Sequence, residues 1–371
     1  MSHDPQSHYL PYAYTGPHGC GGFIKVMPDD FFVEEIPAYL PSGNGEHIYI
    51  FIEKKGVSTA TITNQIAKIF KVPTNSIGHA GLKDTQAITR QWISIHTSNP
   101  VKEENLLIEN VKVLDISRHS NKLRPGHLFG NKFDVMIRDV KISKHFDQLL
   151  RFIQDTGFPN YFGIQRLGNA GRTANFGKKH VQSGFQSTGS LNQIRFKTNA
   201  YQSAIFNAII AHRISEFGFL DKFLPGDIAC LHQSAGFFSV DPSNIIEAND
   251  RAIQGEISPS GLLPGFKTLI AKGIPGQWEN NILEKENLTL NSFKARGKRY
   301  SPKGERRPVR QRPMNFESEP VLMDDTLCLR LRFVLPSGTY ATSLLREMMK
   351  NDDQPFPFPE ILPIQLKKLN P

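Results

Sequence analysis

Residues 78–92 of the chain read Gly78-His79-Ala80-Gly81-Leu82-Lys83-Asp84-Thr85-Gln86-Ala87-Ile88-Thr89-Arg90-Gln91-Trp92. Two glycines open a short polar loop, and a strand-like segment, 91–95, follows it. Glycine allows backbone angles that other residues avoid, and it lets a bulky partner approach closely. Asp84 is therefore expected on a loop braced by regular elements. Such an aspartate can meet a polyanionic substrate, or it can simply cap a turn through its own side chain.

The sequence around this loop predicts alternating strands and helices. Runs rich in β-branched and aromatic residues predict strands at 31–36, 46–52, 91–96 and 132–140. Apolar residues at helical spacing predict helices at 61–70, with Ser58 or Thr59 as the cap, and at 145–156. A strict apolar alternation over 327–335 predicts a further strand that leads into a helix at 342–350.

The middle of the chain has a different texture. Residues 158–317 contain many turns, one strong helix predicted at 202–217, and segments punctuated by Gly and Pro. A chain of 371 residues exceeds the usual size of one domain. We therefore expect a discontinuous domain, 1–157 with 318–371, interrupted by an inserted domain at 158–317.

Composition excludes several classes of protein. No run approaches the roughly 20 apolar residues that a membrane helix needs, and the N-terminus lacks the features of a signal peptide. Cys20, Cys230 and Cys328 are too few and too scattered for a disulfide framework or a metal site. We expect a cytoplasmic protein with no metal, no membrane association and, by default, a monomeric state.

The net charge of +9 is concentrated in one segment. Residues 294–312 hold nine Lys and Arg side chains against Glu305 alone, a local excess of +8. Such a block indicates a disordered basic segment or a phosphate-binding patch. Because it lies inside the chain beside Tyr300, we expect a loop that orders on RNA, with Arg306, Arg307 and Arg310 as phosphate ligands.

Six segments in a fixed order resemble the TruD family of tRNA pseudouridine synthases. The Asp84 loop is similar to the family's Gly-x-Lys-Asp signature, and the other five segments are 23–35 with Lys25, 126–133, 159–168, 202–207 and 335–347. The resemblance covers most of the chain. It implies an α+β fold, with a mainly antiparallel sheet in the catalytic domain and an inserted α/β TRUD domain.

The resemblance also implies a function. TruD enzymes are isomerases that convert a uridine of tRNA, at position 13, to pseudouridine, without a cofactor or metal. The partner it implies is tRNA, and the nucleophilic aspartate it implies is Asp84. Whether Asp84 attacks the ribose or removes a ribose proton is left open by the sequence, but either role needs an ionised carboxylate with a cation nearby.

The cation beside Asp84 cannot be the arginine that other pseudouridine synthases use. In the similar motif here, Gly338-Thr339-Tyr340-Ala341-Thr342, Thr342 stands in its place, a departure that TruD proteins share. The resemblance points to Lys25 as the partner. Lys83 is the alternative because it precedes Asp84 directly, although neighbours in an extended chain often point to opposite sides.

The family pattern also implies residues that hold the substrate. Phe133 corresponds to the aromatic that stacks on the flipped base, with Asn131 as its polar companion. Phe133 equally fits a core position of its predicted strand. Gln165 and Arg166 lie in a segment suited to stacking on and hydrogen-bonding RNA, or to a domain hinge.

Two other functions compete with this one. A non-catalytic RNA-binding protein or RNA chaperone on the same scaffold would be expected to lack Asp84. A glycosidase or nucleosidase would need a second carboxylate or a metal, and the acidic pair Asp29-Asp30 fits the family's structural turn better.

Overall fold

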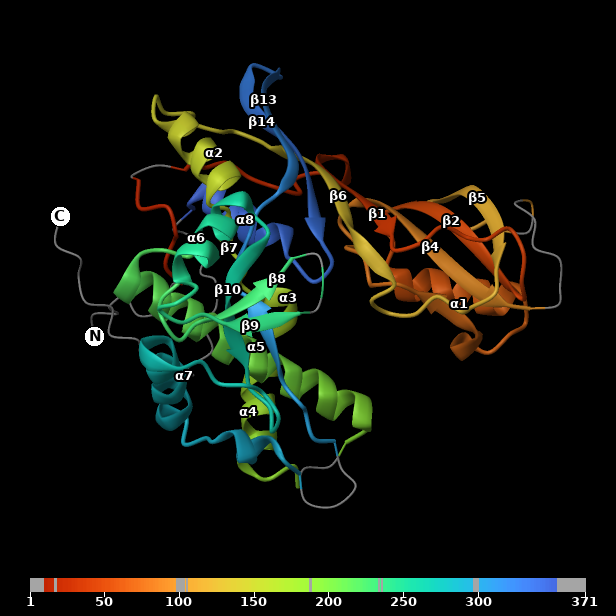
Figure 1. The fold of residues 1–371 in the computed structure, drawn as a ribbon. Coiled ribbons are helices and arrows are strands. Elements are labelled where there is room, and N and C mark those ends of the chain that lie inside the picture. The colour runs from red at the N-terminus through yellow and green to blue at the C-terminus, as the bar shows by residue number, and fades with distance from the viewer. Residues whose placement is uncertain are drawn as a thin grey trace, which may run out of the picture. The chain divides into compact units, whose positions relative to one another are not determined.

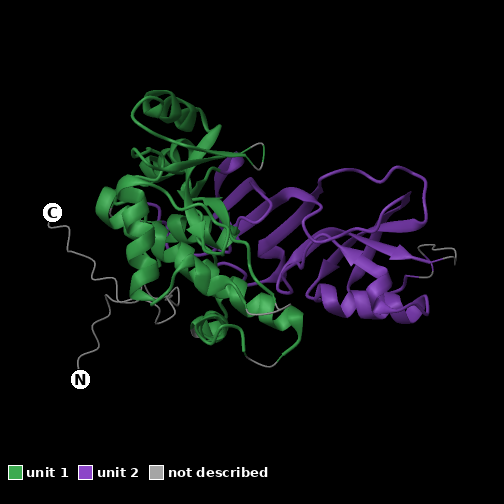
Figure 2. Ribbon diagram, turned by 60° about the horizontal axis from the view of Figure 1, so that its bottom comes forward, with its two compact units in different colours: residues 1–19, 144–312, 340–371 green, residues 20–143, 313–339 purple. Residues whose placement is uncertain are grey.

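The structure is a computed structural model that describes residues 10–16, 19–97, 104, 106–186, 189–232, 234, 236–295 and 300–351. The chain forms two compact units (Figure 2): unit 1 comprises 1–19, 144–312 and 340–371, and unit 2 comprises 20–143 and 313–339. These boundaries differ from the expected division at 157–158 and 317–318. The reason lies in packing, because Phe152 and Tyr340 contact the core of unit 1 around Tyr161 and Phe206.

Unit 2 is built on one eight-stranded sheet. Its strand order is β13-β14-β6-β1-β4-β2-β5, with β3 paired to β4, and among its described residues only β1 and β4 run parallel. The strands are β1 (Phe31–Pro37), β2 (His47–Lys55), β3 (Ile77–His79), β4 (Ile88–His96), β5 (Val111–His119), β6 (Leu128–Ile137), β13 (Met314–Met323) and β14 (Thr326–Pro336). Each strand that the sequence predicts is present in this sheet.

Alternation along β2 decides how unit 2 packs. Ile48, Ile50 and Ile52 lie in the same buried cluster as Ile62 and Ile66 of helix α1 (Thr59–Ile69). The residues between them, beginning with Tyr49, join a second cluster that includes Trp92. The side-chain oxygen of Ser58 accepts a hydrogen bond from the Thr61 amide, so the predicted cap is confirmed.

Unit 1 combines helices with a four-stranded sheet of order β11-β10-β8-β9 (Figure 1). Its helices are α2 (Phe146–Asp155), α3 (Ile164–Leu167), α4 (Arg172–Gln182), α5 (Leu191–Phe217), α6 (Ile245–Gln254), α7 (Gly273–Lys285) and α8 (Ala341–Met349). Its strands are β7 (Phe158–Pro159), β8 (Ile228–Leu231), β9 (Phe237–Ser239), β10 (Ile257–Leu263), β11 (Glu305–Pro308) and β12 (Arg310–Gln311), and β12 pairs with β7. Helix α5 is the centre of the unit, since its buried side chains enter two of the core clusters.

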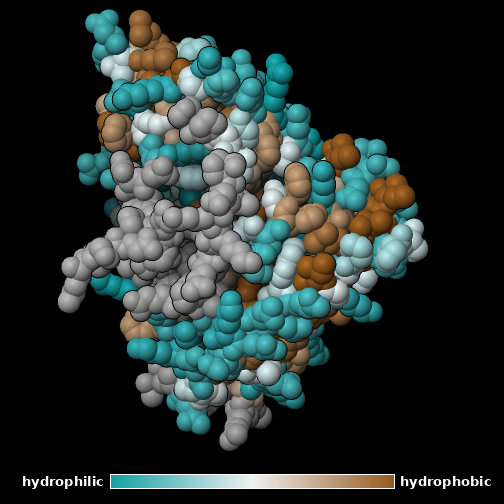
Figure 3. Space-filling view, turned by 90° about the vertical axis from the view of Figure 1, so that its left-hand side faces the viewer, coloured by the Kyte–Doolittle hydropathy of each residue, from teal (hydrophilic) through white to brown (hydrophobic). Residues whose placement is uncertain are grey.

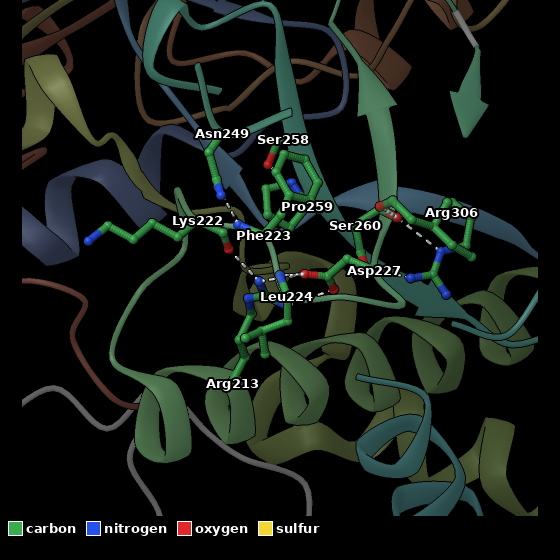
Figure 4. A network of polar contacts seen from close by, with 11 residues as sticks. Arg213, Lys222, Phe223, Leu224, Asp227, Asn249, Ser258, Pro259, Ser260 and Arg306 are labelled. Carbon is green, nitrogen blue, oxygen red and sulfur yellow. Dashed lines mark hydrogen bonds and ion pairs between the residues drawn. The ribbon is translucent and has the colours of Figure 1, made fainter. Parts of the chain in front are cut away.

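Buried ion pairs lie inside unit 1, and Figure 4 shows the contacts of Arg213 with Asp227 and of Arg306 with Ser260. The guanidinium of Arg213 donates to both carboxylate oxygens of Asp227, at 2.9 Å each, and to the carbonyl of Lys222. Arg306 donates to the hydroxyl of Ser260 at 3.0 Å, and it pairs with Glu279 at 2.7 Å. Because a buried charge is costly without a partner, each pair is a structural requirement once it is buried.

The expected α+β class, with a mainly antiparallel sheet, is confirmed. The face shown in Figure 3 is mostly hydrophilic where its residues are described, with hydrophobic side chains interspersed in small groups. Within the described ranges, no helix has the combined length and apolar character that crossing a bilayer requires.

Candidate active site

The Asp84 loop lies between β3 and β4 and is anchored by two side chains from neighbouring elements. The ammonium of Lys54, at the end of β2, donates to the backbone carbonyl of Asp84 at 2.8 Å and to that of Val57 at 2.7 Å. The hydroxyl of Thr59, in the first turn of α1, accepts from the Lys83 amide at 3.2 Å and donates to Gln91 at 3.0 Å. These hydrogen bonds fix the loop backbone on both sides of Asp84.

The two glycines that open the loop have different roles. A Cβ at Gly78 would lie 2.2 Å from the carbonyl oxygen of Leu123, so this glycine is required by close backbone approach. A Cβ at Gly81 would meet nothing within 4 Å. Neither glycine has a positive φ, so the expected special backbone angles are absent.

Lys25 is the cation that contacts the Asp84 carboxylate. Its Nζ lies 3.1 Å from Asp84 Oδ2, and the two side chains are 19% and 30% exposed. The same ammonium lies 4.2 Å from the centre of the Phe31 ring, an electrostatically favourable position. Both side chains are partly exposed, so a substrate can reach the Asp84 carboxylate from solvent.

Lys25 is positioned by contacts on either side of it. Phe23 exchanges two backbone hydrogen bonds of 2.8 Å with Arg138, just beyond β6. The Met27 amide donates to Asp30, which accepts a forked pair of hydrogen bonds from Arg138. Burial opposes ionisation of Asp30, but these hydrogen bonds outweigh it and hold the pKa of Asp30 below its usual value.

Lys83 points to a different set of partners. Its Nζ lies 3.2 Å from Glu35 Oε2 and donates to Asn131 Oδ1, and the side chains of this ion pair are almost fully buried. Burial raises the pKa of Glu35 and lowers that of Lys83, in each case against the attraction between the two charges. Because the lysine can only donate, Asn131 must turn its oxygen toward Lys83. The amide nitrogen of Asn131 remains as the donor for another group.

Phe133 lies on the same sheet face as Asn131, two residues further along β6. It is 6% exposed, and its ring stacks on Phe333 with centroids 5.0 Å apart. Phe31 contacts it edge-on at 6.2 Å. One face of the Phe133 ring is therefore covered by Phe333, and at 6% exposure little of the ring is open to solvent.

Comparison with known proteins adds a family to this geometry. The sequence model of the family described as "tRNA pseudouridine synthase D (TruD)" matches residues 9–191 and 190–348. The chain belongs to the TruD family.

Relatives of the TruD family match the chain over nearly its whole length. The tRNA pseudouridine synthase D of a Thermus thermophilus strain is 40% identical over 338 residues, 90% of each chain. That of Syntrophotalea carbinolica is 33% identical over 398 aligned residues, covering 90% of this chain and 97% of the relative. A crystal structure assigned as tRNA pseudouridine synthase D from Methanosarcina mazei has a TM-score of 0.73 and 25% identity, and covers 93% of this chain and 97% of its own.

The other expected site residues of this TruD protein lie in unit 1. Gln165 is exposed on the short helix α3, and Arg166 beside it is half-buried, with its Nε 3.4 Å from the hydroxyl of Ser203. Arg307 lies 4.1 Å from the centre of the Phe162 ring and donates to Asn160 at 2.7 Å.

Arg306 and Arg310 are placed differently from the expectation. Arg306 is bound to Glu279 and Ser260, while Arg310 is 1% exposed and donates to the backbone carbonyls of Thr156 and Ala252. Guanidinium groups enclosed in this way have no open face for a phosphate. The segment is also not one loop, because it contains β11 and β12, while Arg296, Lys298 and Arg299 lie outside the described residues.

Sequence reasoning missed three residues that hold the loop of this TruD protein. The sequence contains a signal for Glu35. It occupies an inward position of β1 after Phe31 and Val33, where an apolar residue is normal. The sequence contains no such signal for Lys54 and Thr59, since a lysine near a strand end and a threonine at a helix start are ordinary surface features. Only the folded backbone brings them to residues 83 and 84.

Proposed function

We propose that Asp84 is the catalytic carboxylate of this protein and that its target is uridine 13 of tRNA. The observation that carries the proposal is the ion pair between Lys25 and Asp84. Both residues lie in segments similar to the family's, 59 positions apart in sequence, and they meet in unit 2. Catalysis is assigned to unit 2 on this basis.

Membership of the TruD family makes the chain a tRNA pseudouridine synthase, an isomerase. The reaction breaks the bond between N1 of uracil and C1′ of ribose, turns the base, and joins C5 to C1′. N1 gains a proton and C5 loses one, so the overall change is an isomerisation. The reaction therefore requires a carboxylate near the ribose and residues that bind the detached base.

Asp84 can supply the first requirement in either of two ways. It attacks C1′ as a nucleophile, or it removes a ribose proton as a base. Both roles need the ionised form, and the ammonium of Lys25 lies 3.1 Å from this carboxylate. Lys83 is not available for this, because Glu35 and Asn131 hold it on the other side.

Asn131 and Phe133 are suited to the second requirement. The amide nitrogen of Asn131 can donate to a uracil carbonyl, and the Phe133 ring, two residues further along β6 on the same sheet face, is the aromatic side chain on which the base would stack. Stacking of a flipped base on an aromatic side chain is worth about 1–3 kcal/mol, which offsets the cost of removing it from the RNA stack.

Unit 1 is proposed to hold the rest of the tRNA. Gln165 is exposed and Arg166 is half-buried, and the guanidinium groups of Arg166 and Arg307 both lie over the Phe162 ring. We place the protein in the cytoplasm, where its three unpaired, buried cysteines remain reduced. We further propose that it acts as a monomer and without a cofactor.

The experiment is release of tritium from tRNA labelled at uracil C5. The wild-type protein should release one equivalent from a tRNA with uridine at position 13 and none from that position when it is cytidine. Asp84→Asn, which keeps the shape of the side chain, should release none while binding the same tRNA with near wild-type affinity. Turnover by the Asp84→Asn protein, or loss of binding together with turnover, would refute the role of Asp84.

A further inference from the structure

A long stretch of unit 1 contains no acidic residue. Between Asp155 and Glu216 the sequence has seven Lys and Arg side chains and no Asp or Glu. This stretch forms α3, α4 and α5, and the latter two helices pack side by side (Figure 1). The basic block at 294–312 is therefore not the only place where positive charge is concentrated.

Four of these seven cations show two different environments. Lys178 and Arg213 are neutralised locally, by Glu286 at 2.9 Å and by Asp227. Arg195 and Lys197, near the start of α5, have no ion pair with any carboxylate among the described residues.

Arg195 and Lys197 rest on aromatic rings instead. The guanidinium carbon of Arg195 lies 5.4 Å from the centre of the Tyr300 ring, whose hydroxyl donates to Asn199 one helical turn further along α5. The ammonium of Lys197 lies 5.1 Å from the centre of the Phe176 ring on α4. A ring orients a cation without cancelling its charge, so both charges remain available to an anion.

Helices α4 and α5 pack closely together beside these cations. A Cβ on Gly177 would lie 2.0 Å from the carbonyl of Lys197, so this glycine lets α4 touch α5 and places Phe176 beside the lysine. Phe176 and Phe196 are each 51% exposed, although both are large and apolar. Cations interleaved with exposed aromatic rings are typical of surfaces that contact phosphates and stack on unpaired bases of RNA.

We propose that the start of α5 and the adjoining face of α4, with Arg195, Lys197, Phe176 and Phe196, form a tRNA-binding surface, here called the α5 surface. Arg195 and Lys197 contact phosphates, and the phenylalanine rings contact exposed bases. The proposal rests on the tRNA substrate proposed above. It adds residues outside the Asp84 site and outside the basic block.

The test is the affinity for tRNA as a function of salt. Each phosphate contact releases about 0.8 counterion, so its loss should weaken binding about sixfold at 0.1 M salt and reduce the salt slope by about 0.8. Arg195→Gln with Lys197→Gln should therefore bind about fortyfold more weakly than the wild type, with a slope lower by about 1.6. Arg195→Lys with Lys197→Arg keeps both charges and should retain most of the affinity.

Arg251→Gln is the matched control. Arg251 is also a cation beside a ring, that of Phe238 at 5.6 Å, but Glu256 pairs with it at 2.9 Å. Its removal should leave the affinity and the salt slope unchanged. If the double glutamine variant of the α5 surface behaves like this control, or if the charge-keeping variant loses as much affinity as it does, the α5 surface is not a phosphate contact.

The C5 tritium assay separates this outcome from failure of the proposed function. The double glutamine variant should release tritium more slowly than the wild type at subsaturating tRNA, and the difference should shrink as the tRNA concentration rises, because the lost contacts raise KM. If the wild type releases tritium and the double variant binds tRNA with wild-type affinity, the α5 surface is overturned but the proposed function stands. A wild-type protein that neither binds tRNA nor releases tritium overturns both proposals.

Discussion

Lys25 combines a strained backbone with a functional contact. Its φ is 57°, in the left-handed region that non-glycine residues rarely adopt, at a cost of about 1 kcal/mol. Contacts of Phe23 and Met27 on either side keep the backbone in this conformation. The strain has a consequence for the site, because it is in this conformation that the ammonium reaches the Asp84 carboxylate.

Removing the Lys25 charge should lower turnover far more than stability. We expect Lys25→Met to reduce the rate of the chemical step by about two orders of magnitude, as for loss of one electrostatic contact at a reacting group. Lys25→Arg should recover part of that rate. The measurement is single-turnover tritium release, with Lys55→Met as control, since Lys55 pairs with Asp29 where both side chains are half exposed. An equal loss in Lys55→Met would show that the effect is not specific to Asp84.

Lys54 is a fully buried cation beneath the same loop. Burial lowers the pKa of Lys54 to about 8, a shift that the neighbouring charge of Asp84 opposes and that of Lys83 reinforces. Its ammonium binds the carbonyls of Val57 and Asp84 and lacks a carboxylate partner within hydrogen-bonding distance among the described residues.

The stability of unit 2 should depend on pH through Lys54. Below pH 8 both the folded and the unfolded chain hold the proton. Between about pH 8 and the unfolded value of 10.5, only the unfolded chain holds it. Stability rises with pH wherever the unfolded state binds more protons, here by about 1.4 kcal/mol per pH unit. The wild type should therefore gain stability relative to Lys54→Met between pH 8 and 10.

The chain offers a direct reporter for this measurement. It has two tryptophans, of which Trp92 lies in unit 2 and Trp278 in unit 1. In a Trp278→Phe background, urea unfolding followed by fluorescence reports unit 2 alone. A difference between wild type and Lys54→Met that stays constant from pH 7.5 to 9.5 would contradict the lowered pKa.

At the scale of elements, the sequence predicted what periodicity can encode. Strands β1, β2, β4, β6 and β14 and helices α1, α2 and α8 follow from alternation and helical spacing, to within a few residues at each end, whereas β3, β5 and β13 were not predicted. Helix α5 begins at Leu191, eleven residues before the predicted start at Gln202. In the segment 191–199, Leu191 and Phe196 are exposed and only Ile194 packs against the core, so its apolar residues form no buried stripe. Ser190 caps it, and packing on α4 holds it.

Gly177 should be essential for the pairing of α4 with α5. A methyl group at this position would meet the carbonyl of Lys197 at 2.0 Å and the Tyr201 side chain at 2.8 Å. Overpacking of this kind costs about 1–3 kcal/mol, so Gly177→Ala should lower the unfolding free energy of unit 1 by about that amount. Trp278 fluorescence in a Trp92→Phe background reports it. Gly81→Ala in unit 2 is the control, followed by Trp92 fluorescence in a Trp278→Phe background, because a Cβ there meets nothing within 4 Å. An equal loss of stability in the two variants would contradict the close approach.

At the scale of the whole molecule, the sequence could not define the units. Each is assembled from segments far apart in the chain, and contacts such as those of Phe152 and Tyr340 with the core of unit 1 have no local signal. The same limit applies to the site. Lys25 and Asp84 followed from a family pattern, whereas the positions of Arg306 and Arg310 depend on β11 and β12, which a run of basic residues does not reveal.

Arg306 should therefore stabilise unit 1 rather than bind tRNA directly. Arg306→Met leaves Glu279 buried without its partner, and burial already raises the pKa of Glu279 despite the nearby arginine. Loss of one member of a buried pair costs about 3–5 kcal/mol. We expect unit 1 to unfold at correspondingly lower urea, followed by Trp278 fluorescence.

The double variant Arg306→Met with Glu279→Gln distinguishes the two roles of Arg306. If the pair is structural, removing both charges should restore about half of the lost stability, because no uncompensated charge stays buried. The affinity of the folded double variant for tRNA, and its salt slope, should then equal those of the wild type. If Arg306 were a phosphate ligand, the salt slope would instead fall by about 0.8 in both variants, whatever residue stands at position 279. The expected unchanged slope follows from the contacts of Arg306, which direct its guanidinium to Glu279, Ser260 and the Leu269 carbonyl.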